Sequence, residues 1–557
     1  MRRSNGKDYK ERIRKKIWYG IVGYSLFLIG CSQNHLDNTN ITTKIEQQKE
    51  ESVTTDREEK DTKEQKGRAV LESLIQNESF CESVWYEAGL EEDDSKEIIL
   101  QKLNSCESLV LVGPSHGNAV FSLEGLRLMP NLKSLVIDFS IWSDSKIEDF
   151  TPISELLQLK QLYFSYDTEE ALDLSFLAEI QTITELYLPN CKIKDIEFLK
   201  RMPQLERLSL YETPVEDLTV LENLPKLVEL ALSGNKEAKH IEVVGKLFQI
   251  EELGLQNCGL EDIQFLSNLT KLREINLNYN LITDLTPLSS LLKLERLGAA
   301  ANKIRDIQCL AGLSNLYDLS LDQNQIQDLS ALANLSQLNQ VGISDNQIED
   351  FSPLAEKEKL MFLSVFGNPC KDLTPVWQVP LLNFTTDFKV SKEQQKMVAD
   401  WIKEYKSDIE EYECMEYIEG DLNEDGRIDA AFVIEYNNSR DLFVLLCQED
   451  GSWKEIEHDI SIQTAVYGGM RGDPHRGLWM GNGYLLKKCE WGSSLGCVET
   501  EGYRYQNETL ELVLEKDVYD DSFENSYEVT VWMNKDGIEK NDHYRIIMEK
   551  FRMIRKE

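Results

Sequence analysis

Basic residues are in short supply in this chain of 557 residues. It contains 60 Lys and Arg against 98 Asp and Glu, which gives a formal net charge of −38 at pH 7. A surface this acidic repels phosphate backbones and anionic lipid headgroups. The composition therefore argues against nucleic acid as a partner, and it favours solubility, a cationic ligand or divalent ions.

Histidine and the known catalytic motifs are also lacking. The six histidines are scattered, and none lies at a metal-ligand spacing or beside an evident nucleophile. The chain has no G-x-S-x-G, H-E-x-x-H or phosphate-loop motif. Paired carboxylates occur throughout so acidic a chain and identify no active site. The sequence predicts a protein that is not an enzyme.

The apolar run near the amino terminus, residues 17–29, is too short to cross a bilayer, which needs about 20 residues. It follows a basic head and ends in Leu28-Ile29-Gly30-Cys31. This segment resembles a bacterial lipoprotein signal, which implies removal of residues 1–30 and acylation of the Cys31 thiol, for example by palmitate. The expected location is the extracytoplasmic face of the cell membrane, through the lipid anchor only. An ordinary secretory leader with an incidental cysteine is the alternative.

Two segments separate this leader from the main part of the chain. Residues 31–66 have almost no large apolar side chains, so they cannot bury enough surface to offset the entropy of ordering. They are predicted to be a disordered tether. Residues 67–106 have helical periodicity and are predicted to form an amino-terminal helical cap. Cys81 and Cys106 lie within it, and in an exported protein they either form a disulfide or remain separate thiols.

One pattern, L-x-x-[LIV]-x-[LIA]-x-x-N-x-[IP], returns every 22 residues between Leu272 and Asn368. A fixed period of this length predicts a stacked solenoid, in which no unit buries its apolar face alone. Including weaker copies, there are about twelve units. They begin at Leu109, Leu132, Leu159, Ile183, Leu205, Leu227, Ile250, Leu272, Leu294, Leu316, Leu338 and Leu360.

These units resemble leucine-rich repeats, specifically the short class of bacterial internalin-like surface proteins. The resemblance covers residues 107–376. It implies an α/β solenoid with a parallel sheet on the concave face and short 3-10 or α turns on the convex face. The inward Asn of each unit is expected to bond buried backbone groups, and Cys191, Cys258 and Thr213 take its place in three units. An Asp before each convex turn, such as Asp284, is expected to brace that turn.

The outward strand positions form the predicted ligand-binding surface. Carboxylates beside Tyr and Phe suit a protein or peptide partner with basic and apolar contacts, since aromatic residues often dominate binding energy. The small residues Gly298, Ala300, Gly342 and Ser344 would leave room for a bulky partner element. The predicted contact residues on the concave face are Glu185, Tyr187, Arg207, Tyr211, Glu252, Glu274, Asn276, Asn278, Tyr279, Arg296, Asp318, Asp322, Asp345, Phe362 and Phe366.

The composition changes near residue 377, and residues 377–557 are predicted to form a second, mainly β domain. Ser391 is expected to begin a helix, with Gln394 at the capping-box position. Strand-like runs and turns follow. Cys489 and Cys497 flank a Gly/Ser-rich turn and either pair or stay free. The tripeptide at 471–473, Arg-Gly-Asp, is interpreted as a plain turn because Gly and Pro flank it.

An oxygen-rich turn precedes one of these strand-like runs. Its predicted ligands are the side chains of Asp421, Asn423, Asp425 and Asp429 and the carbonyl oxygen of Arg427. Calcium, which prefers roughly six to eight oxygens, is the expected ion, in a structural role. An EF-hand would need Glu where Phe432 lies, so the turn resembles the strand–loop–strand calcium loops of FG-GAP repeats. A bare acidic turn is the alternative.

The favoured function is a lipid-anchored extracytoplasmic protein whose concave surface binds a protein or peptide. In one alternative, the repeats are a scaffold, and the calcium-stabilised carboxy-terminal domain binds glycan or cell-wall material. In the other, that domain contains an unrecognised enzyme.

Overall fold

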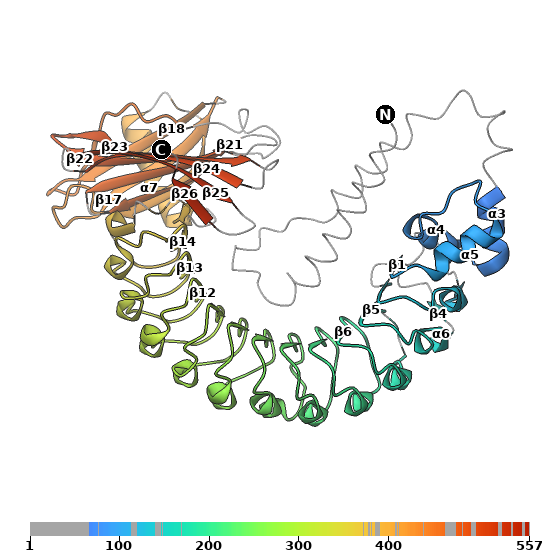
Figure 1. The fold of residues 1–557 in the computed structure, drawn as a ribbon. Helices are drawn as coiled ribbons and strands as arrows, with labels where there is room; N and C mark the ends of the chain where they lie inside the picture. The colour runs from blue at the N-terminus through green and yellow to red at the C-terminus, as the bar shows by residue number, and fades with distance from the viewer. Residues whose placement is uncertain are drawn as a thin grey trace, which may run out of the picture. The chain divides into compact units, whose positions relative to one another are not determined.

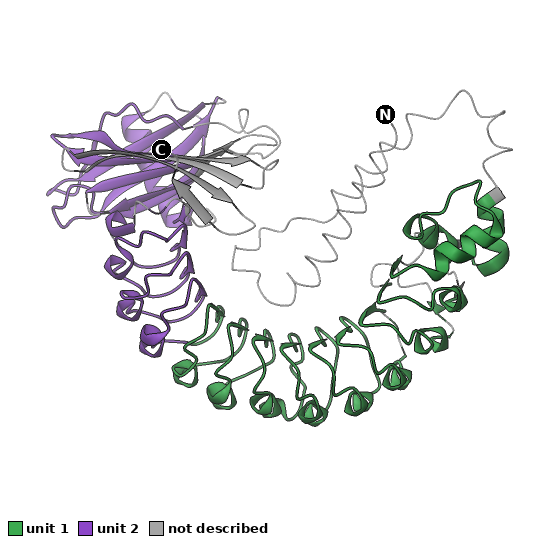
Figure 2. Ribbon diagram, in the orientation of Figure 1, with its two compact units in different colours: residues 1–303 green, residues 304–557 purple. Residues whose placement is uncertain are grey.

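The computed structural model describes most of residues 66–555. The residues outside the description are 1–65, 76, 113–119, 140–145, 148, 167, 169, 371, 377–378, 380, 385–389, 407–408, 410, 438, 463–474, 482, 492–496, 522–525, 536–537, 548–551 and 556–557. The predicted acylation site Cys31, the tether and the Arg-Gly-Asp tripeptide lie outside it. The chain divides into two compact units, residues 1–303 and 304–557 (Figure 2).

The first unit begins with three short helices, which are α3 (Lys66–Ile75), α4 (Glu78–Glu87) and α5 (Lys96–Asn104). Asn77 and Ser95 cap α4 and α5 by accepting the backbone N–H groups of Phe80 and Ile98. The Phe80 ring packs on Phe121 of the first repeats, with ring centroids 6.0 Å apart. The helices therefore close the end of the repeat core. Among the described residues, no helix is both long and apolar enough to cross a membrane.

Cys81 and Cys106 are separate, buried thiols, so the optional disulfide between them is not formed. Burial raises the pKa of the Cys106 thiol, because an apolar environment disfavours the thiolate. These two side chains act as small core residues.

Thirteen short strands form one parallel sheet in which the spatial order follows the sequence (Figure 1). This confirms the predicted solenoid. The strands are β1 (Ser108–Val112), β3 (Ser134–Asp138), β5 (Gln161–Ser165), β6 (Glu185–Tyr187), β7 (Arg207–Ser209), β8 (Glu229–Ala231), β9 (Glu252–Gly254), β10 (Glu274–Asn276), β11 (Arg296–Gly298), β12 (Asp318–Ser320), β13 (Gln340–Gly342), β14 (Phe362–Ser364) and β15 (Leu381–Asn383). A separate parallel pair is β2 (Val120–Phe121) with β4 (Lys146–Ile147).

The last of these strands corrects the predicted end of the repeats. β15 pairs with β14 in parallel, although it lies beyond residue 376. Its sequence lacks the following Asn of the repeat pattern, so the period alone does not reveal it.

A short helical turn follows each strand of the parallel sheet from β1 to β14 on the convex side. These turns are η1 (Glu124–Leu128), α6 (Thr151–Ser154), η2 (Ser175–Glu179), η3 (Glu197–Arg201), η4 (Thr219–Asn223), η5 (Ile241–Lys246), η6 (Gln264–Asn268), η7 (Thr286–Leu288), η8 (Gln308–Gly312), η9 (Ser330–Leu332), η10 (Ser352–Leu354) and η11 (Thr374–Val376). The Asp284 carboxylate accepts the Thr286 backbone N–H at 2.7 Å, and Asp306, Asp328, Asp350 and Asp372 repeat this contact. The predicted bracing role of these aspartates is confirmed.

The repeated Asn satisfies buried backbone groups on two neighbouring units. The Asn280 amide donates to the carbonyls of Leu255 and Leu277, and its oxygen accepts the N–H groups of Cys258 and Leu260. Where Cys258 replaces Asn, its thiol donates to a carbonyl of the preceding unit at 3.3 Å. Cys191 and Thr213 donate in the same way. The expected role of this position is confirmed, and the substitutions keep one donor.

A left-handed residue precedes this position in the regular units, which the sequence did not suggest. The residues with positive φ are Asn190, Glu212, Gly234, Asn257, Tyr279, Ala301, Gln323, Asp345 and Gly367. Seven of these N–H groups donate to carbonyls of the next repeat, as Tyr279 does to Ala300 at 2.8 Å; the seven donors are Asn190, Glu212, Gly234, Asn257, Tyr279, Gln323 and Asp345. The stacking bond holds non-glycine residues in a conformation that otherwise costs free energy.

The carboxy-terminal part of the second unit is mainly β, as predicted. A helix, α7 (Lys392–Tyr405), begins at Ser391 with the expected capping box to Gln394. A four-stranded antiparallel sheet contains β16 (Glu413–Gly420), β17 (Asp429–Tyr436), β18 (Ser439–Cys447) and β19 (Trp453–Glu455). A seven-stranded antiparallel sheet contains β20 (His475–Gly481), β21 (Tyr484–Trp491), β22 (Cys497–Gln506), β23 (Thr509–Asp521), β24 (Ser526–Lys535), β25 (Ile538–Ile547) and β26 (Arg552–Arg555).

Two apolar clusters define three layers in this domain. Trp401 of α7 packs on Phe432 and Phe443, on one face of the four-stranded sheet. The other face packs on the first strands of the seven-stranded sheet, where Val433 and Leu485 share a core. The sheet register places Cys489 opposite Glu499 and Cys497 opposite Trp491.

Candidate functional site

A row of charged side chains follows the first position of six consecutive strands in the first unit. The register places Glu185, Arg207, Glu229, Glu252, Glu274 and Arg296 side by side, one on each strand from β6 to β11. We call these six residues the concave row. Because neighbouring strands of a sheet lie about 4.8 Å apart, their charges interact strongly.

Arginine neutralises the ends of the concave row but not its centre. Arg207 bonds Glu185 at 3.1 Å and Glu229 at 2.9 Å, and Arg296 bonds Glu274 at 3.3 Å. Among the described residues, none forms an ion pair with Glu252. Arg207, Arg273 and Arg296 attract the Glu252 carboxylate through longer-range charge interactions, but the ion pairs of Arg207 and Arg296 within the row go to Glu185, Glu229 and Glu274.

The three central carboxylates resist ionisation. Burial raises the pKa of Glu229 to about 7, the neighbouring Glu252 raises it further, and Arg207 opposes both effects. Burial also raises the pKa values of Glu252 and Glu274. A cation placed on this row would offset that cost by pairing with partly desolvated charges. Glu229 was absent from the predicted contact residues, although its place one residue before the repeat leucine Leu230 could have revealed it.

Four predicted contact residues are buried instead of being available to a partner. Asn276, Asn278, Asp318 and Asp322 have exposed fractions of 3%, 3%, 2% and 7%. Asn278 accepts the Ala300 N–H at 2.7 Å. The prediction that these side chains contact a ligand is wrong: all four are buried, and Asn276, Asn278 and Asp322 accept backbone N–H groups of the repeats.

Asp322 shows the same arrangement in the second unit. It accepts the Ser344 N–H at 2.9 Å and the Ser320 hydroxyl at 3.1 Å, and burial raises its pKa to about 6. A Cβ added at Gly342 would collide with its carboxylate, and one at Gly298 would crowd Asn278. The space next to these glycines is therefore filled by the chain itself and leaves no room for a partner.

The predicted aromatic contacts differ in accessibility. Tyr187 is buried, and its hydroxyl donates to Glu185 at 3.3 Å. Tyr211 is half-buried and donates to Glu212. Tyr279, five residues after Glu274 in the chain, is 50% exposed and is the most accessible of the three predicted tyrosines. In the second unit, Asp345 is exposed, and Phe362 and Phe366 are half-buried.

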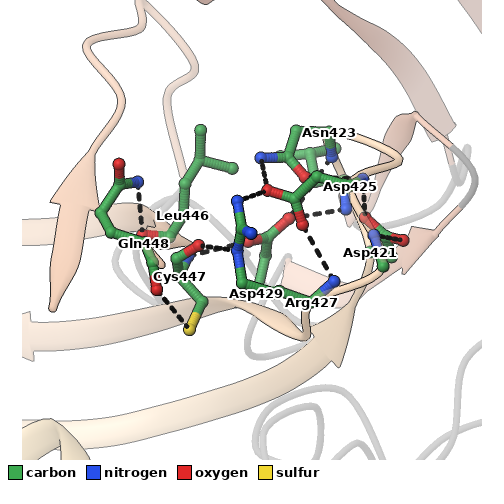
Figure 3. A network of polar contacts seen from close by, with 10 residues as sticks. Asp421, Asn423, Asp425, Arg427, Asp429, Leu446, Cys447 and Gln448 are labelled. Atoms are coloured by element: carbon green, nitrogen blue, oxygen red, sulfur yellow. Dashed lines mark hydrogen bonds and ion pairs between the residues drawn. The ribbon is translucent and has the colours of Figure 1, made fainter. Parts of the chain in front are cut away.

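The oxygen-rich turn between β16 and β17 curls around its own backbone (Figure 3). Asp421 accepts the N–H groups of Asp425 and Gly426 at 3.0 and 2.8 Å. Asn423 accepts the Asp425 N–H, and Asp425 accepts the Arg427 N–H at 2.9 Å. Gly426 has φ of +82°, which permits the bend.

Asp429 and Arg427 occupy structural positions around this turn. Asp429 is buried and accepts the N–H groups of Leu422, Asn423 and Cys447. The Arg427 side chain pairs with Asp425 and donates to the Cys447 carbonyl at 2.8 Å. In the described part of the chain, no three His, Cys, Asp or Glu side chains are grouped to hold a metal ion. The donor types suit a hard cation, and the calcium site stays a prediction.

Comparisons with known proteins agree with the repeat geometry. Residues 181–223 and 249–290 match the family model described as leucine rich repeats (2 copies). No curated protein matches the chain. Together with the thirteen-stranded parallel sheet, the match identifies the solenoid as a leucine-rich-repeat fold.

Solved structures with some similarity come from bacteria and plants. An internalin from Listeria monocytogenes is 26% identical, with 57% of this chain and 97% of that chain covered and a TM-score of 0.48. A leucine-rich-repeat protein of Leptospira interrogans is 18% identical, covering 56% and 97%, with a TM-score of 0.42. The plant peptide hormone receptor RGFR1, in complex with RGF2, is 17% identical, covering 47% and 49%, with a TM-score of 0.36.

Proposed function

We propose that this chain is an internalin-like, lipid-anchored extracytoplasmic binding protein, not an enzyme, and that its concave row binds a protein or peptide partner. The observation that carries the proposal is the Glu229–Glu252–Glu274 centre of the row. These half-buried carboxylates lie on adjacent strands, and Glu252 lacks an ion pair with any described residue.

The chemistry of the row defines the partner as a basic segment. An extended chain or helix carrying Lys or Arg would supply the missing positive charge, and Tyr279 would offer an apolar and hydrogen-bonding contact beside it. Because Glu229 has a pKa of about 7, its full negative charge develops only above neutrality. Affinity for a basic partner should therefore rise with pH between about 6 and 8.

Selection of displayed peptides against the full chain tests this function. We expect basic peptides to be enriched. The triple variant Glu229→Gln/Glu252→Gln/Glu274→Gln should bind these peptides with an affinity lower by about tenfold or more. The matched control, Glu197→Gln/Glu222→Gln/Glu242→Gln, removes the same charge from exposed positions in η3, η4 and η5. Equal losses in both triple variants would reduce the effect to general charge attraction and reject the row as the site.

The lipid anchor is a separate part of the proposal and rests on the leader sequence alone. In a bacterial host, the wild-type chain should incorporate a palmitate analogue and fractionate with membranes. Cys31→Ser should abolish labelling and leave the protein unprocessed or released. Unchanged labelling of Cys31→Ser would show that the leader carries no such signal.

Calcium binding by the turn at 421–429 is a further part of the proposal, supported by its oxygen donors and its fold around Gly426. Calorimetry of the full chain should show one calcium-binding event that disappears in Asp421→Asn/Asp425→Asn. An identical titration in this variant would exclude the turn.

A further inference from the structure

A cleft in the second unit lies between the last repeats and the carboxy-terminal domain. Its volume is about 770 Å³, within the range of roughly 300–1,000 Å³ that is typical of ligand sites. One wall comes from residues 351, 365–370, 373 and 384, and the other from β16, the turn after it and β20. None of the concave row lines it.

Two contacts fix the wall formed by β16 and β20, and one hydrogen bond joins the repeat end to the domain. Gly420 lies so close to the Met480 carbonyl that a Cβ there would collide with it. The Leu478 N–H donates to the buried Glu416 at 2.9 Å, which joins β16 to β20. The buried Lys516 donates to the Val379 carbonyl at 2.8 Å and ties the repeat end to the domain. The cleft is thus formed before any ligand arrives.

The cleft combines an apolar floor with an acidic rim. Phe366, Ile418, Trp479 and Met480 supply apolar surface. Among the described residues that line it, the charged side chains are Glu419, Asp421 and Glu424, and none is Lys, Arg or His. A ligand would therefore meet a net negative charge next to aromatic and aliphatic side chains.

Among the described lining side chains, the carboxylates supply most of the hydrogen-bonding capacity as acceptors, and the Trp479 indole N–H is a donor. The Asn368 amide is already used, because it donates to the Ile343 and Val365 carbonyls and accepts the Ile348 N–H. The Cys370 thiol donates to the Asp372 carbonyl. Glu419 accepts one hydroxyl, from Tyr417, and both Glu419 and Glu424 are exposed. A sugar needs donors and acceptors together, whereas a guanidinium or ammonium group needs acceptors only.

We propose that this cleft is a second binding site, which takes a short extended peptide segment with an Arg or Lys side chain beside a large apolar one. The basic group pairs with Glu419 and Glu424 at the rim, and the apolar side chain packs on Trp479 and Phe366. The site is independent of the concave row, because it shares no residue with it.

Fluorescence polarisation with the full chain in calcium-containing buffer tests the site. The probe is a labelled pentapeptide, LRFRL, and its twin has citrulline in place of both arginines, which keeps the shape but removes the charge. Wild type should bind the arginine peptide about tenfold more tightly than the twin. Glu419→Gln/Glu424→Gln should bring the two affinities together, and Trp479→Ala should weaken both.

Two matched variants locate the effect. Glu411→Gln/Glu413→Gln removes the same charge from exposed positions outside the cleft and should leave the preference intact. The concave-row triple variant should also leave it intact. The proposal is overturned by equal wild-type affinities, by insensitivity to Glu419→Gln/Glu424→Gln, or by an equal loss in either matched variant. Binding of soluble cell-wall glycan in place of the peptide, lost in Trp479→Ala, would assign the cleft to carbohydrate and overturn it as well.

Discussion

The repeats and the carboxy-terminal domain satisfy buried backbone groups by different means. In the repeats, one neutral side chain serves each unit: Asn280, Asn302 and Asn346 bond the same carbonyls of their own and the preceding unit. In the domain, single ionisable residues do this work, such as Asp429 for three N–H groups and Lys516 for a carbonyl 137 residues away in sequence. The repeat solution is local and pH-independent, whereas the domain solution is long-range and titratable.

The largest expected effect is the loss of one repeat Asn. Asn280→Ala leaves four or more backbone groups without their side-chain partner, and we expect it to lower the free energy of unfolding by about 3 kcal/mol or more. Asn280→Thr should cost clearly less, because Thr213 serves the equivalent position. Urea unfolding of the full chain measures both. Equal losses of unfolding free energy in Asn280→Ala and Asn280→Thr would show that the hydrogen bonds of the repeated Asn contribute little.

Replacement of Lys516 tests whether a buried ionisable residue makes the stability of the protein depend on pH. Burial, with a smaller contribution from Lys488, lowers the pKa of Lys516 from its ordinary value of 10.5 to about 7. Between these values the unfolded state binds more protons, so wild-type stability should rise with pH, by up to about 1.4 kcal/mol per unit. Below pH 7 the buried ammonium opposes folding most strongly.

Lys516→Met should remove this slope and raise stability at pH 6. Melting temperatures of both proteins across pH 6–10 decide the outcome. A parallel pH profile in the two proteins would mean that Lys516 does not titrate in this range. Lys303→Met, at an exposed position in the repeats, is the matched control and should change neither slope nor stability.

A smaller effect is expected for Asp429→Asn, because the substitution retains one of the two acceptor oxygens. The new amide group faces backbone N–H donors, so we expect a loss of about 2 kcal/mol in metal-free buffer. Asp450→Asn at an exposed turn provides the comparison and should cost less. If both variants unfold at the same urea concentration, the buried carboxylate is not what holds the turn.

The smallest effect belongs to the convex turns. Asp284 accepts the Thr286 hydroxyl and the Thr286 N–H at the start of η7, and these two hydrogen bonds lower the pKa of the carboxyl. Asp284→Ala should cost about 1 kcal/mol at neutral pH. The wild-type contribution should disappear as pH falls through the folded-state pKa, because protonation removes the charge-assisted bond. A difference between wild type and variant that persists at pH 2 would contradict this assignment.

The repeat period was sufficient to predict the solenoid, the hydrogen-bonding role of the repeated Asn and the aspartates that brace the convex turns. Each depends on contacts between neighbouring units, so a pattern of 22 residues carries the information. The candidate site was predicted only in part. Glu252, Glu274 and Arg207 lie in the concave row as expected, whereas Glu229 was missed.

Burial depth explains the errors on the same face. Asn278 and Asp322 occupy outward positions in the pattern, yet they are buried because their short side chains reach the backbone of the next unit. The longer Glu side chains at the row extend to solvent and remain half-buried. Side-chain length and the residue on the next strand decide whether an outward polar side chain is exposed or buried. The repeat period contains neither kind of information.

The amino-acid sequence by itself determined the stacked architecture, because each unit buries its leucines only against its neighbours and the period fixes that neighbour. Only the tertiary structure decided which polar residues meet solvent and where the acidic cleft lies. Those features depend on contacts between segments far apart in the chain, such as β16 with β20 and Lys516 with Val379. Contacts of that kind do not recur at a fixed spacing along the chain, so a sequence repeat cannot reveal them.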